Sequence, residues 1–183
     1  MIFRDMSNIS KIQYVDSRSI SAENPEGKRG FGGQASGELG KGRKGKAYLD
    51  LEPDKETTIA DIEGPGVINH IWITVQDSSP KGEFVLRDLV LRMYWDNSEK
   101  PSVEVPIGDF FCCGFSTKCQ VNSLPIVVAP YGGFNCFFPL PFRKRARITV
   151  ENQHGGLIHA FFYTVNYSLT DKIDDDCGYF HAQ

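Results

Sequence analysis

The sequence predicts an all-β protein: a single jelly-roll or β-sandwich domain of about eight strands with a long glycine-rich N-terminal loop. Two observations lead to this prediction. Long helical patterns of apolar residues are missing, whereas short segments of alternating or β-branched residues recur along the chain. The 18 glycines and 10 prolines lie between such segments, where the turns of a sandwich or jelly roll are expected.

The composition is that of a folded domain with no nucleic-acid or membrane partner. The 183 residues are 40% hydrophobic, and the formal net charge is only −3. No segment approaches the roughly 20 apolar residues that span a membrane, and the first residues do not form a secretory signal. We therefore expect a cytoplasmic protein, in which the odd number of cysteines, five, fits reduced thiols.

The first part of the chain is unlike the rest. Residues 21–45 are dense in glycine and basic residues and poor in apolar ones, so we expect regular strands to begin near Ala47. A loop of this length usually has a function or is ordered by a partner, and disorder without a partner is the alternative. We expect an N-terminal arm and glycine-rich loop over residues 1–46 and the jelly-roll domain over residues 47–170.

The first predicted strands follow in order. Residues 57–62 alternate as a half-buried strand does, the Gly64-Pro65-Gly66 turn follows, and residues 67–75 are rich in β-branched residues. Residues 84–95 fit both a helical stripe and a strand. We favour a strand there, preceded by a short helical turn near Arg87 and Asp88.

The remaining strands are shorter or more clearly alternating. Two prolines bound the segment 101–106, which suits an edge strand. The other predicted strands are residues 124–128, 134–138, 146–151 and 157–168. Acidic residues then interrupt the pattern, so we interpret residues 171–183 as an acidic linker and the start of a missing second half.

Common catalytic signatures are missing from the sequence, and we assign no catalytic residue. Cys112, Cys113 and Cys119 cluster, but their spacing is not C-x-x-C and no histidine follows at a ligand-like interval, so we expect neither a metal nor a cofactor.

Candidate substrate-binding residues lie in two loops. Glu23 and Asn24 lie in the first, and Asp109 lies in the second, where it precedes Phe110 and Phe111. A carboxylate beside two aromatic rings fits a sugar pocket, which combines apolar faces with a few polar groups. The alternative is that Asp109 only caps a turn through backbone amides.

Several segments together resemble the N-terminal half of glycoside hydrolase family 172, which was formerly a family of unknown function. The similarity runs in order over nearly the whole chain, and each segment alone would be weak. The segments are 18–25 (RSISAENP), 61–72 (DIEGPGVINHIW), 91–96 (LRMYWD), 101–111 (PSVEVPIGDFF), 135–142 (NCFFPLPF) and 179–183 (YFHAQ).

The resemblance implies one jelly roll that pairs with a second in full-length members, and activity on α-D-fructofuranosides or D-arabinofuranosides. It also implies a homo-oligomer, a trimer or a multiple of trimers, or a second polypeptide that supplies the missing half. The family's catalytic glutamates lie in that second half, so we expect this chain alone to be inactive. The alternative is a non-catalytic jelly roll that binds carbohydrate or drives oligomerisation.

Overall fold

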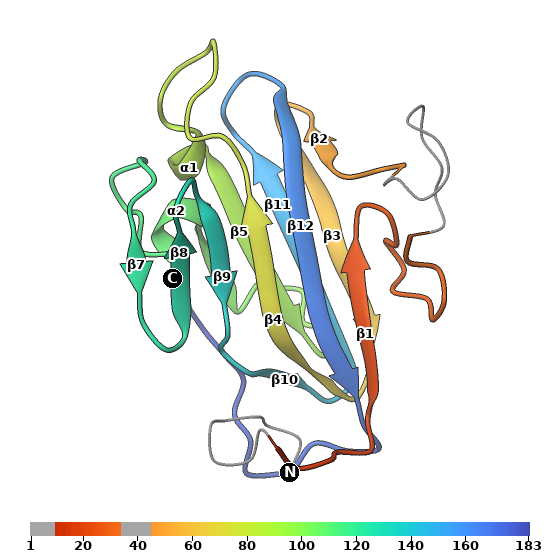
Figure 1. Cartoon of the computed structure of the whole chain (residues 1–183). Helices are drawn as coiled ribbons and strands as arrows, with labels where there is room; N and C mark the ends of the chain where they lie inside the picture. Colours follow the sequence, from red (N-terminus) through yellow and green to blue (C-terminus); the bar gives the residue numbers. More distant parts are fainter. Residues whose placement is uncertain (1–9, 34–44) are drawn as a thin grey trace.

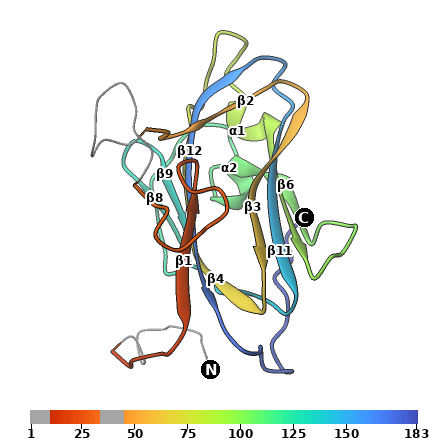
Figure 2. The same cartoon turned by 90° about the vertical axis from the view of Figure 1, so that its right-hand side faces the viewer.

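The computed structural model describes residues 10–33 and 45–183, and it is a sandwich of two antiparallel sheets (Figures 1 and 2). This confirms the predicted fold class. The larger sheet contains β1 (Asp16–Ser21), β2 (Leu49–Leu51), β4 (Gly66–Thr74), β7 (Val121–Asn122), β8 (Ile126–Ala129), β9 (Gly133–Cys136), β10 (Leu140–Phe142) and β12 (Ile158–Leu169). The smaller sheet contains β3 (Lys55–Glu63), β5 (Leu89–Trp95), β6 (Val103–Pro106) and β11 (Arg145–Asn152).

The order of strands places distant parts of the chain side by side. The main path of the larger sheet is β1-β12-β4-β9-β8-β7, with β10 paired to β4 and β2 paired to β12. The smaller sheet runs β3-β11-β5-β6 and packs against one face of the larger one, as the side view shows (Figure 2). The first and last regular strands, β1 and β12, are therefore neighbours.

Side-chain alternation explains the core between the sheets. In β11, Ala146, Ile148 and Val150 are fully buried and point into the sandwich. In β4, Ile71 and Ile73 are buried from the opposite side, whereas His70 and Trp72 are only partly buried. Burying alternate residues of two facing sheets is the main source of stability in such a fold.

The ambiguous segment 84–95 contains both elements that its pattern allowed. The helical turn α1 (Val85–Asp88) is followed at once by β5. Leu89, Leu91 and Met93 are fully buried on one face of β5, as a strand requires. The prediction of a strand after a short helical turn is confirmed.

The prediction that regular strands begin near Ala47 is wrong, because β1 precedes the glycine-rich loop. β1 pairs with β12 along its whole length, from Asp16 opposite Leu169 to Ser21 opposite Thr164. Ile20 is the only fully buried side chain in β1, so the strand lacked an apolar pattern. Of the loop itself, residues 34–44 lie outside the described residues.

The C-terminal segment packs back onto the smaller sheet. Trp95 Nε1 donates a hydrogen bond of 2.8 Å to the carbonyl of Phe180. Ala182 forms a parallel bridge with Val103, and its carbonyl accepts a 3.0 Å hydrogen bond from the amide of Glu104. The last residues therefore cover the edge strand β6.

Asp96 connects this segment to the sandwich. Its Oδ1 accepts hydrogen bonds from the backbone amides of Arg143, Lys144 and Arg145 at 2.9, 2.6 and 3.2 Å. Its Oδ2 accepts one from the Tyr179 hydroxyl. Burial raises the pKa of Asp96, but these hydrogen bonds outweigh it and hold the pKa below its ordinary value.

We predict that Asp96→Asn lowers the free energy of unfolding by about 2 kcal/mol, because three backbone amides and the Tyr179 hydroxyl lose a shared charged acceptor. Asparagine tolerates the positive φ of 53° at this position, so the loss reports on the charge. Urea denaturation measures it. The control is Asp54→Asn, at another positive φ with an exposed side chain, and an equal loss there would contradict the prediction.

The same interaction should make stability depend on pH. A carboxyl group whose pKa is lowered by folding contributes its full stabilisation above the ordinary value of about 4. That contribution is lost as the pH falls through the lowered folded value. The difference in unfolding free energy between wild type and Asp96→Asn should therefore shrink below about pH 4, and a constant difference down to pH 2 would be inconsistent with it.

Candidate functional site

The structure separates the predicted site residues into two groups. Asp109 and Phe110 belong to the helical turn α2 (Ile107–Phe110), which lies between β6 and the loop that leads to β7. Glu23 and Asn24 lie in the turn that follows β1. Since β1 and β7 end the main path of the larger sheet, the two groups lie at opposite sides of the sandwich (Figure 1).

A pocket of about 310 Å³ lies beside α2, and we call it the aromatic pocket. Three phenylalanine rings contribute to it. The Phe138 and Phe180 ring centroids are 5.1 Å apart, and those of Phe110 and Phe180 are 6.2 Å apart. The full lining is Glu104, Val105, Pro106, Asp109, Phe110, Ile126, Phe138, Phe180, Ala182 and Gln183.

Phe111 does not line the aromatic pocket. Its side chain is fully buried, with its ring centroid 5.0 Å from that of Phe110 and 5.3 Å from that of Phe134. It therefore supports Phe110 from the core side. Phe138 and Phe180 were not identified from the sequence, although each lies in a segment of the family resemblance.

The Asp109 side chain forms one ion pair, and its other carboxylate oxygen has no hydrogen-bond partner within the described residues. Its Oδ2 accepts a hydrogen bond from Arg87 Nη1, whereas its Oδ1 is buried and accepts no hydrogen bond within the described residues. The side chain does not cap α2, because the amide of Cys112 bonds to the backbone oxygen of Asp109 instead. An unmet buried acceptor costs about 1–3 kcal/mol, so a hydroxyl donor that reached Oδ1 would be favoured.

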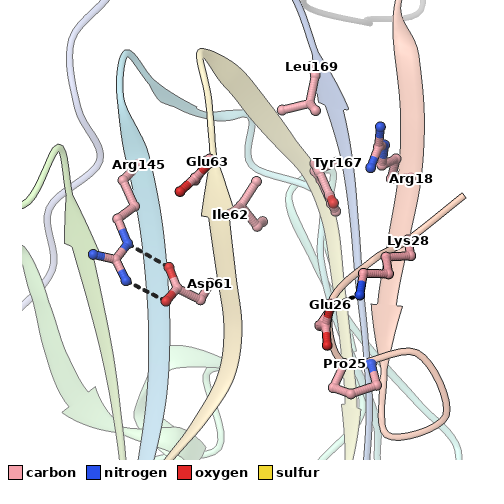
Figure 3. A pocket seen from close by; sticks show the side chains of 10 residues that line it. All are labelled: Arg18, Pro25, Glu26, Lys28, Asp61, Ile62, Glu63, Arg145, Tyr167 and Leu169. Atoms are coloured by element: carbon pink, nitrogen blue, oxygen red, sulfur yellow. Dashed lines mark hydrogen bonds and ion pairs between the residues drawn. The ribbon is translucent and has the colours of Figure 1, made fainter.

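A larger depression of about 640 Å³ lies between β1 and β3, and we call it the charged pocket (Figure 3). Its charges are largely neutralised by neighbours. Asp61 accepts two hydrogen bonds from Arg145, which are the main reason that the pKa of Asp61 is lowered. Lys28 forms an ion pair with Glu26 on the opposite wall. A charged ligand would have to displace these partners.

Asn24 shapes the wall of the charged pocket without lining it. Its Oδ1 accepts a 3.1 Å hydrogen bond from the amide of Lys28, and its Nδ2 donates a 3.0 Å bond to the Lys28 carbonyl. This closes a turn that carries Pro25 and Glu26 into the pocket. Glu23 is not part of the lining, and its Oε1 is buried with no hydrogen-bond partner in the described residues.

No metal centre is found in the part of the chain that the structure describes. Within it, no three histidine, cysteine or acidic side chains are grouped so that they could hold a metal ion. Neither helical turn of these residues has the length and apolarity that a membrane crossing requires.

Comparison with known protein families identifies the chain. A family model described as GH172 domain-like matches residues 42–160, which is well over half of the sequence. The chain belongs to this family. It is thus a member of a glycoside hydrolase-related family, as the sequence resemblance implied. A search of curated proteins found no match.

The matched range covers more of the aromatic pocket than of the charged pocket. Most of the aromatic pocket falls inside it, including Glu104, Asp109, Phe110 and Phe138. Glu23, Asn24 and the rest of the β1 turn fall outside it. The GH172 domain-like region therefore contains the better candidate for a site shared with the family.

We predict that Gly27→Ala destabilises the protein by about 1–3 kcal/mol, because a Cβ atom there overpacks the core-facing side of the turn. Gly27 has a positive φ of 60°, and its Cβ would lie 2.4 Å from the Tyr167 hydroxyl. The control is Gly30→Ala, where φ is 78° but a Cβ would meet no atom within 4 Å. Denaturant unfolding compares them, and equal losses would rule out the clash with Tyr167.

Proposed function

We propose that this GH172 domain is the sugar-binding part of a furanosidase-type site, and that its catalytic carboxyl groups come from polypeptide outside the described residues. The ligand class is an α-D-fructofuranoside or a D-arabinofuranoside. The observation that carries the proposal is the aromatic pocket, in which three phenylalanine rings lie beside the Asp109 carboxylate. Ligand pockets commonly combine apolar walls with a few placed polar groups.

The size and wall of the pocket suit one sugar ring. Its volume, about 310 Å³, is at the small end of the range for ligand sites. The rings of Phe110, Phe138 and Phe180 offer apolar faces to the C–H side of a sugar, whereas Asp109 and Glu104 offer acceptors to its hydroxyl groups. The apolar rings and the carboxylates thus match the C–H groups and the hydroxyl groups of a furanose, respectively.

The carboxyl groups of this chain support a binding role more than a catalytic one. A glycosidase needs one carboxyl group with a raised pKa and a second that is ionised. In the aromatic pocket Asp109 is paired with Arg87, and Glu104 accepts a 2.6 Å hydrogen bond from Arg92. Elsewhere, the pKa of Asp61 is lowered rather than raised. Each of these carboxyl groups is already engaged by an arginine, so we infer that the general acid comes from other polypeptide.

Exposed apolar side chains support a partner at the same side of the sandwich. Phe115, Leu124 and Tyr131 are 97, 84 and 98% exposed. They lie in the loops that flank β7 and β8, and β8 contributes Ile126 to the aromatic pocket. Large exposed apolar side chains of this kind are typical anchors of protein interfaces. We propose that another subunit, in a trimer or a multiple of trimers, or a second polypeptide covers this edge.

The proposal predicts binding of furanosides without hydrolysis. The purified chain should not release the aryl group from aryl α-D-fructofuranoside or arabinofuranoside, but one of these sugars should raise its melting temperature. Asp109→Asn and Phe110→Ala should each abolish that rise. Circular dichroism checks that both variants fold.

Asp61→Asn is the matched control, because Asp61 is also paired with an arginine but lies in the charged pocket. It should keep the sugar-dependent rise. If the wild-type chain hydrolysed the aryl furanoside and Asp109→Asn abolished that hydrolysis, the proposal that the catalytic carboxyl groups lie on other polypeptide would be contradicted. If the sugar still raised the melting temperature of both Asp109→Asn and Phe110→Ala, the aromatic pocket would not be the binding site.

A second candidate function is non-catalytic carbohydrate binding on the outer face of the larger sheet. In Figure 1 none of the strands and helical turns of the described residues lies over this face. His70 stacks on Phe137 with ring centroids 4.6 Å apart, and it bonds to Asn135 and Asn166 at 3.1 Å each. A shallow depression of about 360 Å³ adjoins them, and it is lined by Ser17, Arg18, Ser19, Asn69, Asn166, Tyr167 and Ser168. Hydroxyl and amide groups beside an aromatic pair suit a neutral sugar.

This second function predicts that Asn166→Ala weakens binding of a neutral furanose oligosaccharide by about tenfold, the value of one lost hydrogen bond of about 1.4 kcal/mol. Titration calorimetry measures the dissociation constant. Asn122→Ala, in the exposed part of β7, is the control and should bind as wild type does. If both variants bind equally, the outer face is not the site.

A further inference from the structure

The loop between α2 and β7 holds two thiols at hydrogen-bonding distance from each other. Cys113 Sγ and Cys119 Sγ are 3.1 Å apart, and both cysteines are free. Cys113 is 2% exposed, whereas Cys119 is exposed to solvent. One sulfur is therefore open to a small reagent from solution, and the other lies directly behind it.

A backbone hydrogen bond fixes the buried cysteine to α2. The amide of Cys113 donates a 2.6 Å bond to the carbonyl of Gly108. Gly108 allows this approach, because a Cβ atom there would lie 2.8 Å from the Cys113 carbonyl oxygen.

The far side of the loop is anchored as well. Ser116 Oγ donates a 3.0 Å bond to the carbonyl of Glu83, and the amide of Lys118 donates to Asp77 Oδ2 at 3.3 Å. Cys119 is oriented by its own contacts, since its amide approaches Cys113 Sγ at 3.5 Å and its thiol points to the Cys112 carbonyl at 3.5 Å. The loop is therefore held on both sides, which keeps the two sulfur atoms next to each other.

We propose that Cys113 and Cys119 are a redox site that a peroxide converts into a disulfide. The exposed Cys119 sulfur attacks one peroxide oxygen, the O–O bond breaks, and Cys119 becomes a sulfenic acid while one water is released. The Cys113 sulfur then attacks the Cys119 sulfur. The hydroxyl group leaves with the proton of Cys113 as a second water, so two thiols are oxidised by one hydrogen peroxide.

The geometry requires only a small movement. A disulfide has a sulfur–sulfur distance of about 2.05 Å, so the two atoms have to approach by roughly 1 Å from their present contact. Cys112 takes part through its carbonyl rather than its sulfur. With no third ligand grouped around the pair in the described residues, oxidation is better supported than metal binding.

The disulfide would also fix one side of the aromatic pocket, a consequence that rests on the proposed function. Gly114, inside the loop, lies against Asp109, since a Cβ atom there would be 3.4 Å from Asp109 Oδ1. Oxidation restrains this loop and with it the surroundings of the unmet Asp109 oxygen. The redox state of the pair thereby adjusts the pocket wall.

The first test uses the full chain and one equivalent of hydrogen peroxide. Mass spectrometry of proteolytic fragments should find Cys113 joined to Cys119, with a mass lower by two hydrogen atoms, and dithiothreitol should reverse it. Cys113→Ser and Cys119→Ser should abolish the cross-link. Cys112→Ser is the matched control, one residue away, and should keep it.

Two outcomes would overturn the redox site: a cross-link that includes Cys112, or over-oxidation of Cys119 in wild type with Cys113 still reduced. The link to the pocket has its own readout. The sugar-dependent rise in melting temperature should differ between reduced and oxidised wild type but not in Cys113→Ser. If the sugar raised the melting temperature equally in reduced and oxidised wild type, although the cross-link had formed, only the link between the disulfide and the pocket would be rejected.

Discussion

The Asp96 carboxylate is the interaction on which the arrangement around the aromatic pocket depends. It lies just after β5, accepts hydrogen bonds from the three successive amides of residues 143–145 that lead into β11, and accepts another from the Tyr179 hydroxyl. Three parts of the chain that are far apart in sequence are thereby joined at one charge. Trp95, the preceding residue, donates to the carbonyl of Phe180. The ring of Phe180 reaches the pocket because Asp96 holds Tyr179, the residue before it, and Trp95 holds the carbonyl of Phe180 itself.

This constraint explains why the candidate site depends on more than the GH172-like region. The matched residues 42–160 include the whole smaller sheet and β2, β4 and β7 to β10 of the larger one, together with Asp109, Phe110 and Phe138. Phe180 and Ala182 come from the segment that follows, which pairs with β6 through Val103. A change at Asp96 is therefore expected to alter the pocket from a distance, through loss of this packing.

The sequence predicted those parts of the fold in which side-chain burial follows a simple period. β11 and β5 were predicted because alternate apolar residues face the core. β1 was not, since its inward positions include Asp16 and Arg18, which pair with each other by a 2.7 Å ion pair. The short strands β7 and β10 have too few residues for any period to show. Their position comes from pairing with neighbours, which is a tertiary effect.

The site was predictable only in part, for a related reason. Asp109 and Phe110 were recognisable as a carboxylate beside an aromatic ring. That Phe111 turns into the core, and that Phe138 and Phe180 meet across the pocket, depends on pairing between distant segments. Glu23 and Asn24 were plausible polar loop residues, yet Asn24 makes its side-chain bonds to its own turn. Polar character alone does not separate a ligand contact from a turn contact.

The central claim is that a furanoside binds in the aromatic pocket, and amide chemical shifts in an NMR titration test it most directly. With increasing arabinofuranoside, the account predicts shifts for the amides of α2, Phe138 and residues 179–183. The amides of the turn at residues 24–28 should stay unchanged. Shifts confined to that turn or to the outer sheet face around Asn166, or no shifts at a saturating sugar concentration, would contradict it.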